Sequence, residues 1–383
     1  MGVRAHVVVV GAGYAGVMAA NRLAAVGQSD VRVTVVNPRA EFVERIRLHE
    51  HAAGGTNAVQ RRRGLLHRDV RLRVAAVDEI GARSVRLDDG AALGFDYLVY
   101  AVGSAAATGV PGVEYAYRVA DLAGAEALRL RLPRLPAGAR VVVIGGGLTG
   151  IETSAEIAYR YPSLTVELVS RSVAGWLPES SRATIEGKLV QAGVQLLTGL
   201  RVSGVRSDGV VTDADLLPSD CTVWAGSFGV PDLALRSGLP VSADGRLRTG
   251  DTLVCVDHGR IVGVGDAVMP PGHVGEHVRM SCQAAIPMGA HGADTVLALI
   301  RGEEPEPLSL GLAGQAISLG RRDGFIQATH RDDSARGFTL SGRVAAVAKE
   351  QVCRWTLTSM RFPRAYRWRP GPAVPEPIPA AIR

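Results

Sequence analysis

The sequence predicts an α/β chain with two Rossmann-like dinucleotide-binding domains and a small α+β domain at its C-terminal end. Two glycine-rich turns lead to this prediction. The first, Gly11-Ala12-Gly13-Tyr14-Ala15-Gly16, follows an apolar run at 6–10 and precedes apolar residues at helical spacing. The second, Gly145-Gly146-Gly147-Leu148-Thr149-Gly150, stands between an apolar run at 140–144 and an expected helix over 151–159. Two such strand–turn–helix units predict an enzyme that passes electrons between two dinucleotides.

The composition indicates a folded protein of two or three domains. The chain has 383 residues, of which 47% are hydrophobic, which is enough to bury substantial cores. Its formal net charge is +6, and nearly all positive charge is arginine, because Lys188 and Lys349 are its only lysines. Such a composition is typical of a GC-rich bacterial gene. Since the positive charge is spread along the chain, we expect no nucleic-acid partner.

Nothing in the sequence indicates secretion or a metal centre. No secretory signal precedes the first expected strand, and no apolar run reaches the roughly 18 residues that span a bilayer. The cysteines are scattered and form no CxxC pair: Cys221, Cys255, Cys282 and Cys353. They fit a reducing cytoplasm. His273 and His277 are four residues apart but lack an evident third ligand, so we expect a cytoplasmic protein without a bound metal.

Each glycine of the first turn has its own role in holding a dinucleotide. Gly11 allows the tight turn, Gly13 lets the backbone approach a pyrophosphate, and Gly16 lets the helix pack closely on the strand. The helix that begins near Tyr14 and Ala15 offers unpaired N–H groups and the positive end of its dipole to the phosphates.

The segment after this helix supplies further candidate cofactor residues. Asn37 ends the next expected strand, 31–36, at the place where an acidic residue usually binds the ribose, and its amide can still hydrogen-bond a hydroxyl. Arg45, Arg47 and His49 could lie near the cofactor and bind an anionic group. Alternatively, they could pair with neighbouring acidic residues on a surface helix: Glu41, Glu44 and Glu50. The surface interpretation is the favoured one, with Arg45 kept as a candidate cofactor residue.

The second turn repeats the pattern and indicates which nicotinamide nucleotide binds there. Gly145, Gly147 and Gly150 occupy the three glycine positions, with Thr149 in the first helical turn. Ser170 stands in the acidic position after the strand 165–169, and Arg171 follows it. A small polar residue followed by arginine suits a 2′-phosphate, so the site favours NADPH over NADH. The alternative is that Arg171 points into solvent.

Two further segments extend the pattern. The strand at 95–100 runs into a small-residue turn that contains Ala101 and Gly103, and a strand at 260–264 ends in Gly265-Asp266. With the two glycine turns in this order, residues 5–300 resemble the two-dinucleotide-domain flavoprotein reductases of the pyridine nucleotide–disulfide oxidoreductase superfamily. The resemblance implies FAD at the first turn, with Asp266 holding the ribityl chain of the flavin, and a nicotinamide nucleotide at the second.

The resemblance also implies that the nicotinamide domain interrupts the FAD domain. We expect five segments: 1–110 and 233–302 for the two parts of the FAD domain, 111–232 for the NAD(P) domain, 303–370 for the C-terminal domain, and 371–383 for an extended tail.

The identity of the electron acceptor divides this superfamily. Disulfide reductases need a dithiol near the flavin, and no cysteine precedes Cys221. The chain therefore most resembles type II NADH:quinone oxidoreductases and apoptosis-inducing-factor-like reductases, which implies a quinone-like small-molecule acceptor. A ferredoxin-reductase-like electron-transfer protein, a redox-sensing NAD(P)H-binding flavoprotein and a tailoring oxidoreductase of specialised metabolism are the alternatives.

Three residues are candidates for catalysis. Glu152 ends the TGxE segment, residues 149–152. It could help to position or protonate a reactant, or it could simply be a carboxylate that the helix dipole stabilises in the first turn. Gln283 resembles the first of two glutamines on the helix that contacts quinone, and Pro287 replaces the second. We expect this proline either to kink the helix or to lie near its start. His277 is a candidate proton donor to the reduced acceptor.

The C-terminal part begins after a proline-rich linker at 303–307. Strands are expected within 308–326 and one helix over 344–360, surrounded by arginines and aromatic residues. This helix could pack within the protein or in a homodimer. Alternatively, it could contact an anionic membrane as a peripheral anchor on the inner face of the cell membrane, as the resemblance to type II NADH dehydrogenases implies.

Overall fold

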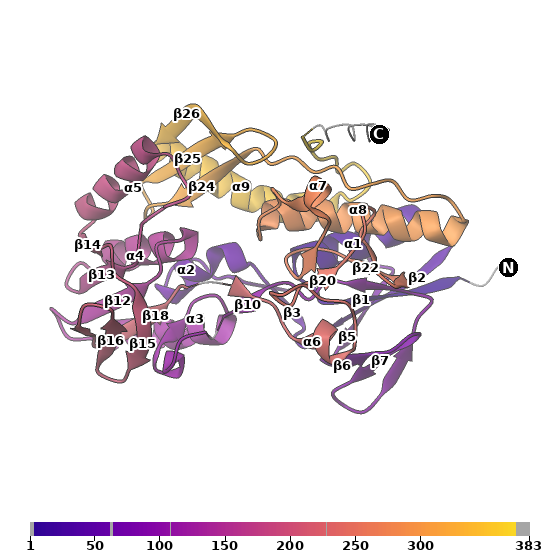
Figure 1. Cartoon of the computed structure of the whole chain (residues 1–383), viewed down its shortest axis with the longest axis horizontal. Helices are drawn as coiled ribbons and strands as arrows, with labels where there is room; N and C mark the ends of the chain where they lie inside the picture. The colour runs from indigo at the N-terminus through magenta and orange to yellow at the C-terminus, as the bar shows by residue number, and fades with distance from the viewer. Residues whose placement is uncertain (1–3, 62–63, 108, 227, 373–383) are drawn as a thin grey trace, which may run out of the picture.

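A first sheet, parallel except for its antiparallel edge strand β21, forms the core of one lobe of the molecule (Figure 1). The computed structural model describes residues 4–61, 64–107, 109–226 and 228–372. The six strands lie in the order β21-β22-β9-β1-β2-β5. Their bounds are β1 Ala5–Val10, β2 Val31–Asn37, β5 Val70–Val74, β9 Tyr97–Tyr100, β21 Val254–Cys255 and β22 His258–Gly263. Because β21 and β22 join strands from the first hundred residues, this domain is discontinuous, as predicted.

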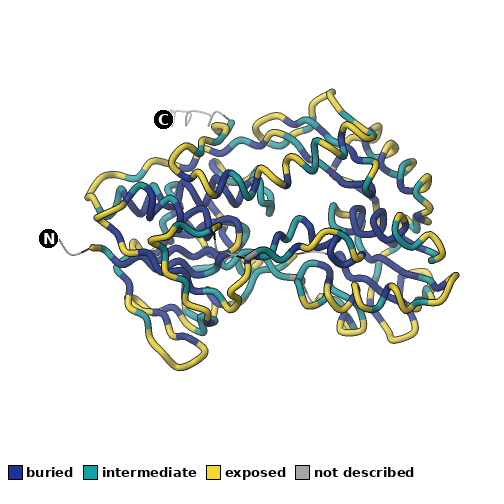
Figure 2. The backbone as a smooth tube through the Cα atoms, turned by 180° about the vertical axis from the view of Figure 1, so that it is seen from behind, coloured by how far each residue is buried: buried dark blue, intermediate teal, exposed yellow. Residues whose placement is uncertain are grey.

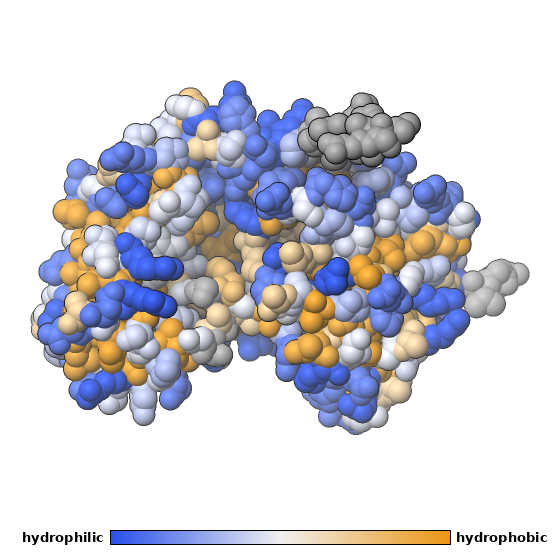
Figure 3. Space-filling model, in the orientation of Figure 1, coloured by the Kyte–Doolittle hydropathy of each residue, from blue (hydrophilic) through white to orange (hydrophobic). Residues whose placement is uncertain are grey.

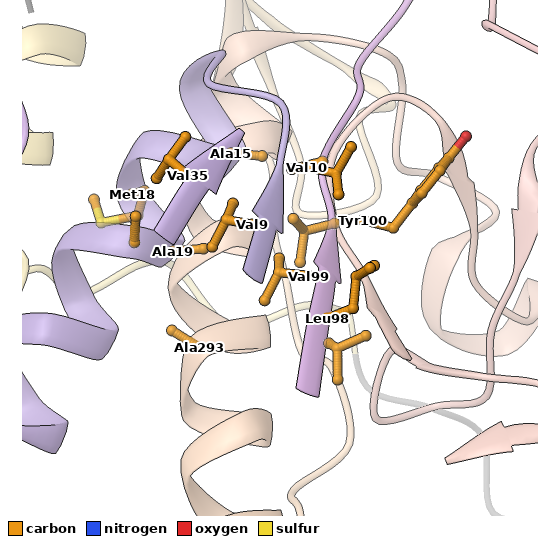
Figure 4. Close-up of a cluster of buried hydrophobic side chains, with 14 of the residues drawn as sticks. Val9, Val10, Ala15, Met18, Ala19, Val35, Leu98, Val99, Tyr100 and Ala293 are labelled. Carbon is orange, nitrogen blue, oxygen red and sulfur yellow. The ribbon is translucent and has the colours of Figure 1, made fainter. Parts of the chain in front are cut away.

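Two helices cover this sheet at close range. The valines of β1 are almost fully buried, as is typical of a parallel strand covered on both faces. They pack against α1 (Tyr14–Gly27) and α8 (Cys282–Arg301), whose side chains Met18, Ala19 and Ala293 meet the strands in Figure 4. Gly289 permits this contact, since a Cβ there would lie 2.3 Å from the carbonyl oxygen of Ala15.

A second parallel sheet builds the other lobe. Its strands lie in the order β11-β18-β12-β13-β14. They span β11 Tyr117–Arg118, β12 Arg140–Ile144, β13 Thr165–Val169, β14 Val194–Leu197 and β18 Cys221–Trp224. The helices of this lobe are α3 Leu122–Arg131, α4 Leu148–Arg160 and α5 Glu179–Gln191. Figure 2 shows the buried strands inside both lobes and the exposed loops around them. The predicted class, two Rossmann-like domains with one inserted into the other, is confirmed.

The C-terminal part is an antiparallel sheet with one long helix. The strands β24 (Gly314–Ser318), β25 (Gly324–Thr329) and β26 (Ala335–Ser341) pair in sequence order. Helix α9 (Arg343–Arg361) confirms the expected helix to within a residue at each end. It packs on β24 and β25 and reaches α1 of the first lobe, where Asn21 Nδ2 donates to the Met360 carbonyl at 2.8 Å. Helix α9 thus borders the first lobe as well as the C-terminal sheet.

Shorter elements complete the described part of the chain. The short strands are β3 Glu41–Val43, β4 Val59–Arg61, β6 Val77–Ile80, β7 Ser84–Leu87, β8 Ala92–Gly94, β10 Ala105–Ala106, β15 Val202–Arg206, β16 Gly209–Thr212, β17 Leu216–Pro218, β19 Phe228–Gly229, β20 Leu247–Arg248 and β23 Val268–Met269. The short helices are η1 Arg45–Arg47, α2 Leu48–Ala52, η2 Val113–Tyr115, η3 Leu132–Arg134, α6 Leu233–Arg236 and α7 Gly272–Gly275. Over the residues that the structure describes, none of the helices has the length and apolar character that crossing a membrane requires. Most of the expected tail, from residue 373 onward, lies outside the described residues.

Candidate functional site

Of the three glycines in the first turn, one faces open space and two face backbone atoms. Gly11 has φ +99°, and a Cβ there would lie 2.3 Å from the Ala101 carbonyl oxygen. A Cβ at Gly16 would lie 2.0 Å from the Gly11 carbonyl oxygen. A Cβ at Gly13 would meet no atom within 4 Å. The turn is therefore closed where strand and helix meet and open at the helix N-terminus, which fits a pyrophosphate approaching Gly13.

The residues around this turn hold its shape. The Asn37 carboxamide oxygen accepts a hydrogen bond from the Ala12 N–H at 3.0 Å, and its Nδ2 donates to the Arg39 carbonyl at 2.9 Å. Asn37 thus ties the end of β2 to the turn. Tyr14 is buried and meets the Phe42 ring edge-on at 5.2 Å between centroids. Ala15 is buried beside it, at the contact between α1 and α8.

Asp266 belongs to a polar cluster beside the same turn, since a Cβ at its neighbour Gly265 would lie 3.0 Å from the Ala15 Cβ. The Ser104 hydroxyl donates to Asp266 Oδ2 at 2.7 Å, and Arg45 Nη1 donates to the Ser104 carbonyl at 2.5 Å. Gly103 and Gly265, which precede Ser104 and Asp266, have φ values of +71° and +81°. Two left-handed turns therefore bring Ser104 and Asp266 together. This arrangement puts Arg45 at the predicted flavin site.

The second glycine turn has the same geometry as the first. A Cβ at Gly145, where φ is +120°, would lie 2.6 Å from the Ala225 carbonyl oxygen, and one at Gly150 would lie 1.8 Å from the Gly145 carbonyl oxygen. A Cβ at Gly147 would meet nothing within 4 Å. Thr149 follows in the first turn of α4. This turn is therefore also open at its middle glycine, as a second dinucleotide requires.

The end of β13 offers unsatisfied polar groups beside this turn. The hydroxyl of Ser170 is buried and has no hydrogen-bond partner. Arg171 is exposed, and no acidic side chain of the described residues pairs with it. A buried hydroxyl without a partner costs free energy unless a ligand satisfies it, so this edge fits the ribose end of a nucleotide.

The charged segment after β3 is buried, which overturns the favoured surface interpretation. Glu44, Arg47, His49 and Glu50 are each no more than 5% exposed. Arg47 does pair with Glu44 at 3.2 Å and with Glu50 at 3.3 Å, as expected, but it also pairs with Glu350 of α9 at 2.9 Å. The surface interpretation failed because α4 and the C-terminal domain cover this segment, and the local charge pattern does not encode that contact.

Glu152 lies at the centre of the contact between α2, α4 and α9. Its side chain lies 3.0 Å from Lys349 Nζ, accepts the Ser318 N–H at 2.9 Å and lies 3.6 Å from His49 Nδ1. Burial opposes ionisation of Glu152, but Lys349, His49 and the Ser318 N–H outweigh it and lower its pKa. Burial likewise opposes the charge on Lys349, whose pKa Glu152 raises. Glu152 is therefore an ionised partner in a buried pair.

Sequence reasoning missed Lys349, and one signal could have found it. In a chain whose positive charge is almost all arginine, a lysine within an expected helix is unusual. Lys349 also bonds the Ala316 carbonyl at 2.8 Å. Burial raises the pKa of the Cys282 thiol, the charge of Lys349 lowers it, and the charge of Asp266 raises it. The Glu152–Lys349 pair therefore lies near the start of α8 and the polar cluster of Asp266.

The other two predicted catalytic residues have hydrogen-bond partners of their own. Gln283 Oε1 accepts from Arg279 Nη2 at 2.9 Å, at the start of α8. His277 Nε2 lies 2.6 Å from the Leu310 carbonyl oxygen, and among the described residues no hydrogen bond or ion pair joins its ring to Glu152. Pro287 lies inside α8, which continues through it to Arg301. Both catalytic assignments stay predictions.

The two histidines weighed as metal ligands have different partners. His273 Nε2 lies 2.9 Å from Asp251 Oδ2, whereas His277 contacts a backbone carbonyl. Across the part of the chain that the structure describes, no three His, Cys, Asp or Glu side chains form a group that could hold a metal ion.

Open space lies in two places near these sites. Figure 3 shows a hollow between the two lobes, near the centre of that face. A cavity of about 1000 Å³ lies beside the connection between the lobes, lined by residues 109–118 together with Gly124 and Ala127. None of the predicted site residues lines that cavity.

Comparison with known proteins identifies the family. The model of the pyridine nucleotide-disulphide oxidoreductase family matches residues 5–289. An NADH dehydrogenase-like protein of Mycobacterium tuberculosis is 33% identical over 76% of this chain and 80% of its own length. The type II NADH:quinone oxidoreductase of Staphylococcus aureus is 26% identical over 91% of this chain and 94% of its own.

A solved structure supports the fold over nearly the whole chain. The sulfide:quinone oxidoreductase of Aquifex aeolicus superimposes with a TM-score of 0.80 at 18% identity, covering 94% of this chain and 92% of that one. The two open glycine turns and the family match agree on an FAD and a nicotinamide nucleotide. The chain is a member of the pyridine nucleotide-disulphide oxidoreductase family, an NAD(P)H-dependent FAD enzyme.

Proposed function

We propose that this protein transfers electrons from NAD(P)H through FAD to a quinone. The relatives' names support a quinone acceptor, since one is a type II NADH:quinone oxidoreductase and another is the demethylphylloquinone reductase of Synechocystis, 25% identical over 68% of this chain. The observation that carries the proposal is the buried Glu152–Lys349 pair near the start of α8. A quinone takes up protons as well as electrons, and this pair can hold a proton inside the protein.

The cysteines argue against a disulfide substrate. All four are free. Burial raises the pKa of the thiols of Cys221, Cys255 and Cys353 to about 12, and exchange requires a thiolate. A dithiol mechanism therefore lacks its reactive group.

We propose that two sets of residues hold the cofactors. For FAD they are Gly11, Gly13, Tyr14, Ala15, Gly16, Asn37, Arg45, Ala101, Gly103, Gly265 and Asp266. For the nicotinamide nucleotide they are Gly145, Gly147, Thr149, Gly150, Ser170 and Arg171. The open glycines Gly13 and Gly147 support the two phosphate positions. The unpartnered hydroxyl of Ser170, followed by the exposed Arg171, supports NADPH.

When bound, FAD supplies the two-electron chemistry, and the protein supplies position and protons. Asp266, held by Ser104, offers its carboxylate to the ribityl chain. Glu152 and Lys349 hold a proton for the acceptor oxygen. Gln283, whose Oε1 is held by Arg279, can donate from Nε2 to an acceptor carbonyl.

An acceptor panel tests this function. The purified holoenzyme is mixed with NADPH or NADH in a stopped-flow instrument, and the reduced flavin is then mixed with a soluble ubiquinone, menadione, ferredoxin or oxygen. We expect fast reoxidation by quinones. Fast reoxidation by ferredoxin with slow quinone rates would replace the proposal with the electron-transfer alternative, and a long-lived reduced complex with every acceptor would favour a sensor.

We further propose a peripheral membrane contact through α9. The outward face of this helix and the residue that caps its C-terminal end carry exposed apolar side chains: Val344, Val347, Val352, Trp355 and the cap Phe362, each at least 50% exposed. Arg343, Arg354 and Arg361 are exposed on the same helix. Apolar and aromatic residues flanked by arginine suit the interface of an anionic leaflet, which would place the protein on the cytoplasmic face of the cell membrane.

The contact is tested by substitution. Because α9 packs on the rest of the protein, deleting it would disturb the fold. The double variant Trp355→Ser/Phe362→Ser changes only its exposed face. We expect the wild type, but not this variant, to sediment with anionic vesicles, and salt to weaken the binding. A homodimer that the same variant dissociates, with no vesicle binding by the wild type, would show that a second copy covers this face.

A further inference from the structure

His49 is a buried histidine that the chemistry proposed so far does not use. It is 4% exposed, on α2, and its Nε2 has no hydrogen-bond partner. Its Nδ1 lies 3.6 Å from Glu152 Oε2, and its Nε2 lies 3.9 Å from Glu50 Oε1. The ring therefore stands between two carboxylates, with one nitrogen turned toward each.

The proposed reaction needs a proton from outside the reactants. Oxidation of NAD(P)H breaks one C–H bond and yields two electrons and one proton. Quinol formation consumes two electrons and two protons, because it makes two O–H bonds. One proton per turnover must therefore reach the acceptor from solvent through the protein.

We propose that His49 relays this proton to Glu152, which delivers it to the acceptor. This inference rests on the proposed quinone reductase function. We assign the resting ring the tautomer with its proton on Nδ1. The ring gives that proton to Glu152 as Nε2 takes another from water on the Glu50 side, and exchange of the ring protons with water then returns the proton from Nε2 to Nδ1. His49 acts through Glu152 and is therefore a positioning residue.

The surrounding charges suit a relay at this point. Glu50 lies on the same helix, and burial opposes its ionisation, but the hydrogen bond and the charge of Arg321 lower its pKa to about 2. It therefore remains a carboxylate that orients the ring. Arg321 is 28% exposed, so the Glu50 side borders solvent. Glu152 faces His49 from α4, backed by Lys349 of α9, and Arg47 of η1 pairs with Glu50.

His51 provides a matched control. It lies on the same helix, is 2% exposed, and its Nε2 also lacks a hydrogen-bond partner. Its charged neighbours are Arg129 and Glu126 of α3, and its Nδ1 accepts the Ala58 N–H at 3.5 Å. It thus shares the burial and the helix of His49 but points away from Glu152.

The test compares His49→Gln and His49→Asn with His51→Gln, as holoenzymes. Flavin reduction by NADPH and flavin reoxidation by menadione are measured separately from pH 5.5 to 8.5, in H2O and in D2O. We expect His49→Gln to keep its FAD and its reduction rate. Its reoxidation should slow about 100-fold, the lower end of the range for a positioned proton donor, and its pH profile should differ from that of the wild type. His51→Gln should match the wild type.

Each other outcome overturns the relay. Wild-type reoxidation rates and pH profile in both His49 variants would show that the proton takes another route. Loss of FAD, or an equal loss in both half-reactions, in both variants would assign His49 a purely structural role. If no quinone reoxidises the wild type, the proposed function fails and the relay fails with it. This outcome is seen in the wild type alone, whereas failure of the relay alone is seen only in the His49 variants.

Discussion

The substitution Glu50→Gln should destabilise the protein by an amount that depends on pH. Glu50 is 4% exposed, close to Arg321 at 2.8 Å and Arg47 at 3.3 Å. Burial raises its pKa, but the hydrogen bond and charge of Arg321 outweigh this and lower it from 4.5 to about 2. A group with a lowered folded-state pKa stabilises the fold above its unfolded pKa and loses this contribution as the pH falls through the folded value.

The magnitude follows from the shift. A difference of about 2.5 pKa units corresponds to about 3 kcal/mol at pH 7, which agrees with the roughly 3–5 kcal/mol lost when one partner of a buried pair is removed. By the same linkage, Glu50 contributes only about 1–1.5 kcal/mol to the free energy of unfolding at pH 3, where the carboxyl of the unfolded chain is already protonated.

Urea unfolding of wild type and Glu50→Gln at pH 7, pH 5 and pH 3, followed by circular dichroism, measures this difference. The exposed linker residue Glu303 provides the control, and Glu303→Gln should change stability by less than about 0.5 kcal/mol. A difference between wild type and Glu50→Gln that is below about 1 kcal/mol at pH 7, or that does not shrink toward pH 3, would refute the reasoning.

Three further predictions concern the nucleotide sites. Gly13→Ala should fold with an unchanged melting temperature but retain less FAD, because its Cβ enters the open space proposed for the phosphates. Gly16→Ala should lower the melting temperature of the apoprotein, since its Cβ would lie 2.0 Å from a carbonyl oxygen. Calorimetry and flavin absorbance measure the two effects, and the reverse pattern would be inconsistent with the proposed phosphate position. Asp266→Ala should release FAD on dilution, measured by flavin fluorescence, with Asp251→Ala as the control that keeps it. Arg171→Ala should weaken NADPH binding by about 1–3 kcal/mol and leave NADH nearly unchanged in titrations of flavin reduction, and an equal loss for both nucleotides would place the discrimination elsewhere.

The nucleotide turns could be predicted from sequence because their requirements are local. Gly11 and Gly145 need positive φ, and Gly16 and Gly150 need the absence of a Cβ beside a backbone carbonyl a few residues earlier in the chain. Both conditions are set within one strand–turn–helix unit. The helix α9 could be predicted for a similar reason, since its apolar and basic residues recur at helical spacing.

The buried charge cluster could not be predicted because three distant segments build it. Arg47 and Glu50 come from the segment after β3, Glu152 from α4 of the second lobe, and Lys349 and Glu350 from the C-terminal helix. Within the segment 42–50 alone, alternating charges are typical of a solvated helix. Only the docking of α4 and α9 over α2 removes them from water.

The two faces of α9 connect the proposed membrane contact with the proposed proton supply. Lys349 lies on the inward face with Glu152, and Val347 and Trp355 lie on the outward one. A helix with its side chains is about 10–12 Å across. If the outward face is seated on a bilayer as proposed, the Glu152–Lys349 pair lies about one helix width from the lipid. A quinone dissolved in that lipid would then approach the Glu152–Lys349 pair from the α9 side, while the proton would arrive past Arg321 and Glu50.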